Sequence, residues 1–149
     1  MKLRIYLDTP VFSAYLDERA PERKNLTLEF WRRLDDFEVS TSEIARQEPK
    51  MMPDLYRRER LMSLLNHVTV HPMTPEMRAL AQIYVDGGVF TATSLNDALH
   101  VPAAVLTRQD ILVSWNFKHL VNRRRRALIN DLNVAGNLPT IEIVAPPEV

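Results

Sequence analysis

The amino-acid sequence has no cysteine, no excess of charge of either sign and no long apolar run. The absence of cysteine excludes disulfides and thiolate metal sites, and it agrees with a reducing compartment. Nineteen basic residues balance nineteen acidic ones, so any attraction to a polyanion must come from a local patch. No stretch approaches the roughly 20 apolar residues of a membrane span, and no apolar signal segment precedes Asp8. We therefore expect a cytoplasmic protein with no membrane partner.

Segments typical of strands alternate with segments typical of helices along the 149 residues. Hydrophobic residues make up 46% of the chain, which suits one domain over residues 1–149 with a core of ordinary size. The expected strands are residues 3–7, 37–41, 68–73, 110–115 and 140–144. The expected helices are residues 10–16, 26–34, 42–48, 54–65, 74–88, 94–106 and 117–133, with a kink at Pro102. Strands separated by helices predict an α/β protein whose parallel sheet is covered on both faces.

Oxygen-bearing side chains lie next to several of these strands. Asp8 ends the first strand, and Asn116 follows the fourth. Glu43 and Glu48 lie on the helix after the second strand, and Asp97 lies early in the helix before the fourth. Ligands of open parallel sheets bind beyond the carboxyl ends of the strands, so these side chains are expected to converge there. Clustered carboxylates repel one another unless a cation neutralises them, and Mg²⁺ or Mn²⁺ prefers oxygen ligands.

Each of these residues also has a purely structural explanation. Asp8 can cap the helix that follows it, and Asp97 can form a capping box with Ser94. Glu48 can be a solvated helix residue, and Asn116 can form a turn. Capping explains one residue at a time, but it does not explain why the polar side chains gather at one edge.

Four segments, in this order, resemble the signature blocks of PIN domains, including the VapC-type toxins of bacterial toxin–antitoxin pairs. They read YLDTPVFSAYLD, STSEIARQE, NDALHVPAAV and ILVSWNFKHL, and they span residues 5–121. The resemblance implies a small three-layer α/β/α sandwich with a central parallel sheet. It also implies a Mg²⁺- or Mn²⁺-dependent endoribonuclease that hydrolyses RNA phosphodiester bonds, paired with an antitoxin protein.

Carried over residue by residue, the resemblance makes Asp8, Glu48 and Asp97 the acidic metal ligands. Glu48 is preferred to Glu43 because it matches the family's spacing from the serine, here Ser42. Glu48 would also orient or deprotonate the attacking water.

Asn116 is the main departure from the family, because many PIN domains have aspartate there. The expected function of Asn116 is to fix a water molecule or the phosphate. An asparagine offers an oxygen without charge, so one firmly held ion is expected rather than two. The change also leaves open a catalytically weak or inactive PIN scaffold that binds RNA or protein.

Further residues are candidates for contact with RNA, and each can equally be structural: Thr9, Ser114, His119, Arg123 and Arg124. The two arginines belong to the run at residues 123–126, which is either solvated, in contact with the RNA backbone, or bound to an acidic partner. Apolar residues in segments 30–34 and 51–65 are core residues by default. Alternatively, they form a surface that receives an antitoxin helix or a second copy in a homodimer.

Overall fold

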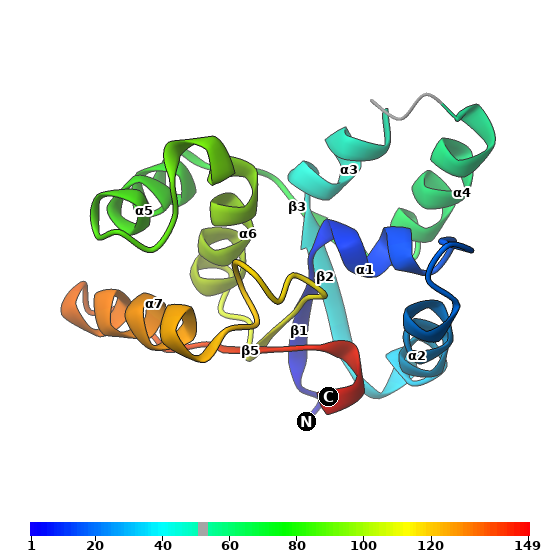
Figure 1. Cartoon of the computed structure of the whole chain (residues 1–149). Helices are drawn as coiled ribbons and strands as arrows, with labels where there is room; N and C mark the ends of the chain where they lie inside the picture. The colour runs from blue at the N-terminus through cyan, green and yellow to red at the C-terminus, as the bar shows by residue number, and fades with distance from the viewer. Residues whose placement is uncertain (51–53) are drawn as a thin grey trace.

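The computed structural model describes the whole chain except residues 51–53 and the side chains of residues 48–50. In the part it describes, five parallel strands form one sheet in the order β3-β2-β1-β4-β5. They are β1 (Arg4–Leu7), β2 (Glu38–Ser42), β3 (Thr69–His71), β4 (Ile111–Val113) and β5 (Glu142–Val144). Helices lie on both sides of the sheet (Figure 1). The predicted three-layer α/β/α fold is therefore confirmed.

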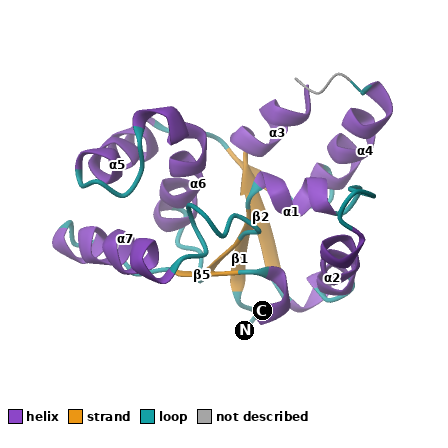
Figure 2. Cartoon of the chain, viewed as in Figure 1, coloured by secondary structure: helices purple, strands orange, loops and turns teal. Residues whose placement is uncertain are grey.

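The helices fall into two layers because the chain leaves β1 in both directions. It crosses first to β2 and β3, then returns to β4 and β5 on the other side, and right-handed crossovers in opposite directions place their helices on opposite faces. Figure 2 shows the strands between the two layers. One layer holds α1 (Thr9–Ala14), α2 (Pro21–Trp31) and α4 (Leu55–Leu65), and the other holds α5 (Pro75–Asp86), α6 (Leu95–Leu106) and α7 (Arg123–Ala135). Between them, α3 (Glu43–Lys50) contributes Ile44 to one core and Ala45 to the other.

Strand residues alternate between the two cores, as the two-residue period of a strand requires. In β1, Tyr6 packs with the layer of α5, α6 and α7, whereas Ile5 and Leu7 pack with the layer of α1, α2 and α4. In β4, Leu112 packs with the layer of α5, α6 and α7, and Val113 packs with the layer of α1, α2 and α4. Burial of each such side chain stabilises the fold by about 1.5–3 kcal/mol, so a slip of register is strongly disfavoured. The register of these two strands fixes the positions of the residues that follow them.

The helix expected at residues 26–34 begins earlier than predicted. α2 starts at Pro21, because proline is favoured in the first turn of a helix. The residues of its first turns are polar. Ala20 at the N-cap has no side-chain acceptor, so the sequence carries no capping signal at this start.

The helix expected from residue 117 begins later than predicted. α7 starts at Arg123, where the side chain of Asn122 accepts a hydrogen bond from the Arg125 backbone N–H at 3.2 Å. The residues before it form turns instead, since the Asn116 carbonyl accepts the backbone N–H groups of Leu120 and Val121 at 3.0 and 2.8 Å. α6, by contrast, runs through Pro102 without a break.

α5 has the ends that its sequence predicts. The Thr74 hydroxyl caps the helix by accepting the backbone N–H of Met77 at 3.3 Å, and Pro75 is the first helical residue. At the other end, Gly88 has φ of +80°. The N–H of Val89 donates to the Tyr84 carbonyl at 2.9 Å, which completes a Schellman motif. The glycine pair therefore ends α5 and sets the position of Val89.

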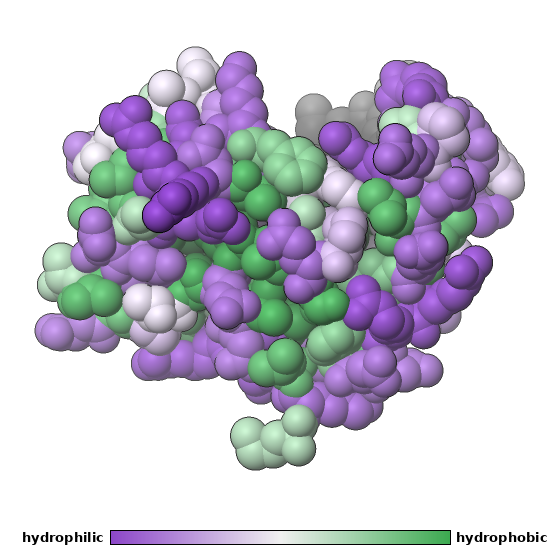
Figure 3. Space-filling model, turned by 60° about the horizontal axis from the view of Figure 1, so that its bottom comes forward, coloured by the Kyte–Doolittle hydropathy of each residue, from purple (hydrophilic) through white to green (hydrophobic). Residues whose placement is uncertain are grey.

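Hydrophobic residues gather in the middle of the face shown in Figure 3, with hydrophilic residues to both sides. This is the pattern of a strand layer that polar helical layers enclose. No helix in the described residues is long and apolar enough to cross a membrane.

Candidate active site

Asp8 and Ser114 follow the adjacent strands β1 and β4 at neighbouring positions. Leu7 pairs with Val113 in the sheet, and the backbone N–H of Asp8 donates to the Val113 carbonyl at 3.2 Å. The strand order reverses at β1, so this is the switch point of the sheet. Open parallel sheets bind their ligands in the crevice at such a point.

The carboxylate of Asp8 is only 1% exposed, and both of its oxygens accept hydrogen bonds. Oδ1 accepts from the backbone N–H of Val11 at 3.3 Å and so caps α1, and Oδ2 accepts from the hydroxyl of Ser114. The structural explanation of Asp8 as a helix cap is thus correct. A carboxylate has about four lone-pair positions, so capping and binding of a cation are compatible in one side chain.

Asn116 is joined to Asp8 through Ser114. The Asn116 backbone N–H donates to Ser114 Oγ at 2.9 Å, while its own Oδ1 accepts the backbone N–H of His119 at 2.9 Å. Asn116 therefore forms the turn that the structural explanation predicts. Nδ1 of His119 is buried and has no hydrogen-bond partner among the described residues.

A chain of buried polar side chains connects β1, β2 and α6 beside this site. The Tyr6 hydroxyl lies 2.7 Å from Ser42 Oγ and 2.7 Å from His100 Nδ1, and His100 Nε2 lies 3.3 Å from Thr9 Oγ1. Burial lowers the pKa of His100 to about 4, so the ring is neutral at neutral pH. A neutral ring has one donor and one acceptor nitrogen, which suits two hydroxyl partners. The bond between Thr9 and His100 therefore connects the start of α1 to α6.

Asp97 lies one helical turn before His100, in the first turn of α6. It is partly exposed, and Ser94 occupies the N-cap position without making a side-chain capping bond, so the helix start does not show the capping box considered for this pair. The positive end of the α6 dipole stabilises a carboxylate at this position.

The third expected ligand, Glu48, lies on α3, but its side chain is outside the described residues. Glu43, its alternative, is partly buried at the first position of the same helix. Among the described side chains, no group of three acidic or histidine residues is close enough to hold a metal ion. The set of Asp8, Glu48 and Asp97 therefore stays a prediction.

The arginine run at the start of α7 divides into two pairs. Arg123 and Arg124 are exposed. The guanidinium of Arg125 donates to the carbonyl of Val89, and that of Arg126 donates to the carbonyl of Ile143 at 2.9 Å. The second pair therefore stabilises the fold, and only the first pair is fully available to a partner.

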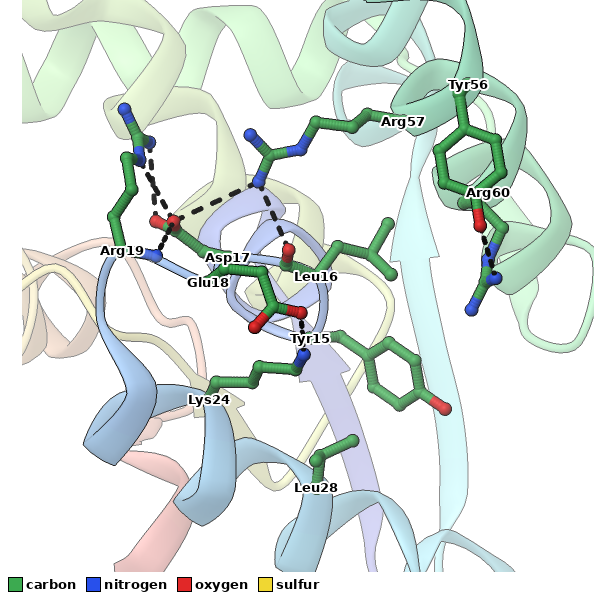
Figure 4. A pocket seen from close by; sticks show the side chains of 10 residues that line it. All are labelled: Tyr15, Leu16, Asp17, Glu18, Arg19, Lys24, Leu28, Tyr56, Arg57 and Arg60. Atoms are coloured by element: carbon green, nitrogen blue, oxygen red, sulfur yellow. Dashed lines mark hydrogen bonds and ion pairs between the residues drawn. The ribbon is translucent and has the colours of Figure 1, made fainter.

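A pocket of about 500 Å³ opens between α1, α2 and α4 (Figure 4). Tyr15, Leu28 and Tyr56 give it large hydrophobic or aromatic side chains. Its charged residues are the basic Arg19, Lys24, Arg57 and Arg60 and the acidic Asp17 and Glu18. Hydrogen bonds from the side chain and from the backbone N–H of Arg19, both at 3.0 Å, hold the pKa of Asp17 below its usual value. The excess of basic residues makes this pocket suited to an acidic partner segment.

The fold has a counterpart among solved structures. A chain in the crystal structure of VapBC2 from Rickettsia felis, bound to a DNA fragment from their promoter, matches with a TM-score of 0.61. The match covers 96% of this chain and 98% of that one, at 12% sequence identity. The likeness is one of fold. A comparison of the sequence with protein-family models finds no matching family. A comparison with curated proteins finds no match either.

The side chains at the carboxyl end of the sheet include oxygen donors of the chemical type that hard cations prefer. A buried aspartate follows β1, a second acid lies in the first turn of α6, and acids lie on α3, so carboxylates are the available donors. Mg²⁺ and Mn²⁺ bind such oxygens, and Mg²⁺ commonly uses only one or two carboxylates with waters and phosphate completing the shell.

Sequence reasoning did not find the bonds of Tyr6 or the different functions of the four arginines. Tyr6 occupies an ordinary inward position of a strand, and its partner His100 is distant in sequence. The run 123–126 does not show which guanidinium meets a carbonyl, because Val89 and Ile143 come from other elements. Such pairs depend on tertiary packing, which the local pattern does not encode.

Proposed function

We propose that this chain is a metal-dependent endoribonuclease of the PIN type and the toxin of a type II toxin–antitoxin pair. The observation that carries the proposal is the buried carboxylate of Asp8, fixed by two hydrogen bonds at the switch point of the sheet. The fold shared with a VapBC2 chain and the four sequence blocks support the same assignment.

Asp8, Asp97 and Glu48 would hold the Mg²⁺ or Mn²⁺ ion in this proposal. The ion, when bound, supplies positive charge for the phosphate and lowers the pKa of a water molecule. Ser114 keeps Asp8 in one orientation, and the turn at Asn116 keeps Ser114 in place. Glu48 would take the proton of the attacking water.

The test is cleavage of single-stranded RNA by the wild type and by Asp8→Asn, with Mg²⁺, with Mn²⁺ and with chelator. Asparagine caps a helix as well as aspartate does, so the variant should fold while losing metal-dependent cleavage. Asp110→Asn is a matched control, because Asp110 precedes β4 at the amino end of the parallel strands, away from Asp8. There its carboxylate accepts the Arg4 backbone N–H at 2.8 Å. Full cleavage by Asp8→Asn would overturn the proposal.

A second candidate is a binding module on the same scaffold without nuclease activity. It is favoured by Asn116, whose uncharged side chain uses its oxygen for a turn. If the wild type binds RNA but does not cut it at any metal concentration, this candidate is selected.

The proposed partner is an antitoxin whose helical segment occupies the pocket between α1, α2 and α4. Its apolar and basic lining favours an amphipathic helix with acidic residues. Arg60→Glu should weaken that complex several-fold, since it reverses the charge at the pocket, and co-purification of the pair measures it. The homodimer and the cytoplasmic location stay predictions.

A further inference from the structure

A second, smaller pocket of about 250 Å³ lies where the turn after α5 meets the start of α7. It is lined by Gly88, Val89, Lys118, Asn122, Arg124, Arg125 and Leu128. Three of these residues are cationic, and none of them is acidic. Its volume is below that of most small-molecule sites, which occupy about 300–1,000 Å³, so it suits a single compact anion.

Hydrogen bonds hold one wall of the pocket in place. The Schellman motif at Gly88 holds Val89, and the Val89 carbonyl accepts a hydrogen bond from the guanidinium of Arg125. The same guanidinium lies 5.9 Å from the ring centre of Phe90, and Asn122 caps the Arg125 backbone N–H. A guanidinium has five N–H donors, so Arg125 is held in place with donors left for a ligand.

The pocket is electrostatically unbalanced. Within the described residues, neither Lys118 nor Arg124 forms an ion pair with an acidic side chain. Three cations around one small pocket repel one another, and the positive end of the α7 dipole lies beside them. An anion in the pocket relieves both effects.

We propose that this pocket binds one backbone phosphate of the RNA strand, separately from the phosphate that reacts at Asp8. The inference rests on the proposed function and adds a substrate subsite to it. Residues 114–122 connect the two places: Ser114 bonds to Asp8, and Lys118, four residues on, lines the pocket. An RNA strand held at both points is fixed in register, which positions the bond to be cut.

The first experiment measures binding of a single-stranded RNA to the full chain in the Asp8→Asn background, where the strand is not consumed. Arg124→Ala and Lys118→Ala should each weaken binding and reduce the slope of log K against log salt concentration by up to about 0.7, the value for loss of the single phosphate contact in this pocket. Arg78→Ala is the matched control, since Arg78 is an exposed helical arginine on α5 outside the pocket, and its slope should stay at the parent value. If Arg124→Ala has the same slope as Arg78→Ala, the subsite is wrong.

The second experiment uses inorganic phosphate as the probe, which makes the inference independent of RNA cleavage. Phosphate added to the wild type at constant ionic strength should shift the backbone amide resonances of residues 88, 89 and 122–125, and Arg124→Ala should abolish the shifts. Shifts that persist in Arg124→Ala, or that are absent from the wild type, would overturn the subsite. If the subsite fails but the wild type cleaves RNA with metal, the proposed function still holds. If the shifts are as expected but the wild type does not cleave RNA, the proposed function fails and the phosphate site remains.

Discussion

One hydroxyl, that of Ser114, connects the two halves of the candidate site. It donates to the buried Asp8 carboxylate and accepts the backbone N–H of Asn116. Ser114 is itself fully buried. The geometry of Asp8 therefore depends on Ser114, a residue of the ILVSWNFKHL segment.

Ser114→Ala should destabilise the fold by about 1–3 kcal/mol, because it removes the hydrogen bond that Ser114 donates to the buried Asp8 carboxylate and the one that it accepts from the Asn116 backbone N–H. Loss of a hydrogen-bond partner of a metal ligand should also lower metal affinity or activity by roughly 10–100-fold. Ser40→Ala is the control, since Ser40 is a buried serine of β2 whose hydroxyl makes one long bond of 3.4 Å to the Ile5 carbonyl. Urea unfolding of both variants measures the difference, and equal losses would contradict this account of Ser114.

His100 should make the stability of the protein depend on pH. Its pKa is about 4 in the folded protein and near 6.5 when exposed. As the pH falls from 6.5 towards 4, the unfolded state takes up a proton that the folded state does not. The free energy of unfolding should therefore fall by up to about 1.4 kcal/mol per pH unit over this range.

Urea unfolding of the wild type and of His100→Gln at pH 7, 6, 5 and 4.5 tests this expectation. The variant keeps a side chain that can bond to the hydroxyls of Tyr6 and Thr9, but it does not titrate. Carboxylates change both proteins alike, so the difference between them isolates His100. Parallel curves would show that His100 takes up its proton over the same pH range in the folded and unfolded states, which would contradict this expectation.

At the scale of helices and strands, the sequence predicted best where a local chemical signal marks an end. Thr74, Pro75 and the two glycines define α5 at both ends, and the structure has the helix there. The start of α2 was missed because Ala20 gives no cap, and the start of α7 because residues 117–121 are held as turns by the Asn116 carbonyl.

In the candidate site, too, some positions could be predicted from the sequence and others could not. The placement of Asp8 and Ser114 at adjacent strand ends could be predicted from strand order, since parallel strands end at one edge. The bonds among Tyr6, Ser42 and His100 could not, because they join side chains from three elements.

One bond between helices gives a prediction at this scale. The hydroxyl of Tyr84 on α5 donates to Oδ1 of Asn133 on α7, and both residues are fully buried. Burial raises the pKa of Tyr84, so the hydroxyl keeps its proton. Tyr84→Phe should cost about 1–3 kcal/mol because it leaves the amide oxygen without a donor.

Adding Asn133→Leu to Tyr84→Phe removes the unsatisfied group, so the double variant should lose less stability than the sum of the single changes. Thermal unfolding of the four proteins gives the coupling. Strict additivity would mean that the two side chains do not depend on each other.

For the molecule as a whole, a metal ion that binds only the folded state should raise the melting temperature. At a concentration of 100 times Kd the gain is about 2.7 kcal/mol, or roughly 5–10 °C for a domain of this size. Calorimetric scans with MgCl₂ or MnCl₂, against NaCl at the same ionic strength, measure it. Asp8→Asn should lose the gain, and an equal gain in both proteins would place the ion elsewhere.

β1 precedes the other strands of the sheet in the sequence and is its central strand. Its second neighbour, β4, follows much later, and the bond between Asp8 and the serine that fixes it spans 106 residues. Until that later part of the chain has been synthesised, Asp8 lies beside an open strand edge. The candidate site is therefore assembled only after Ser114 has been translated.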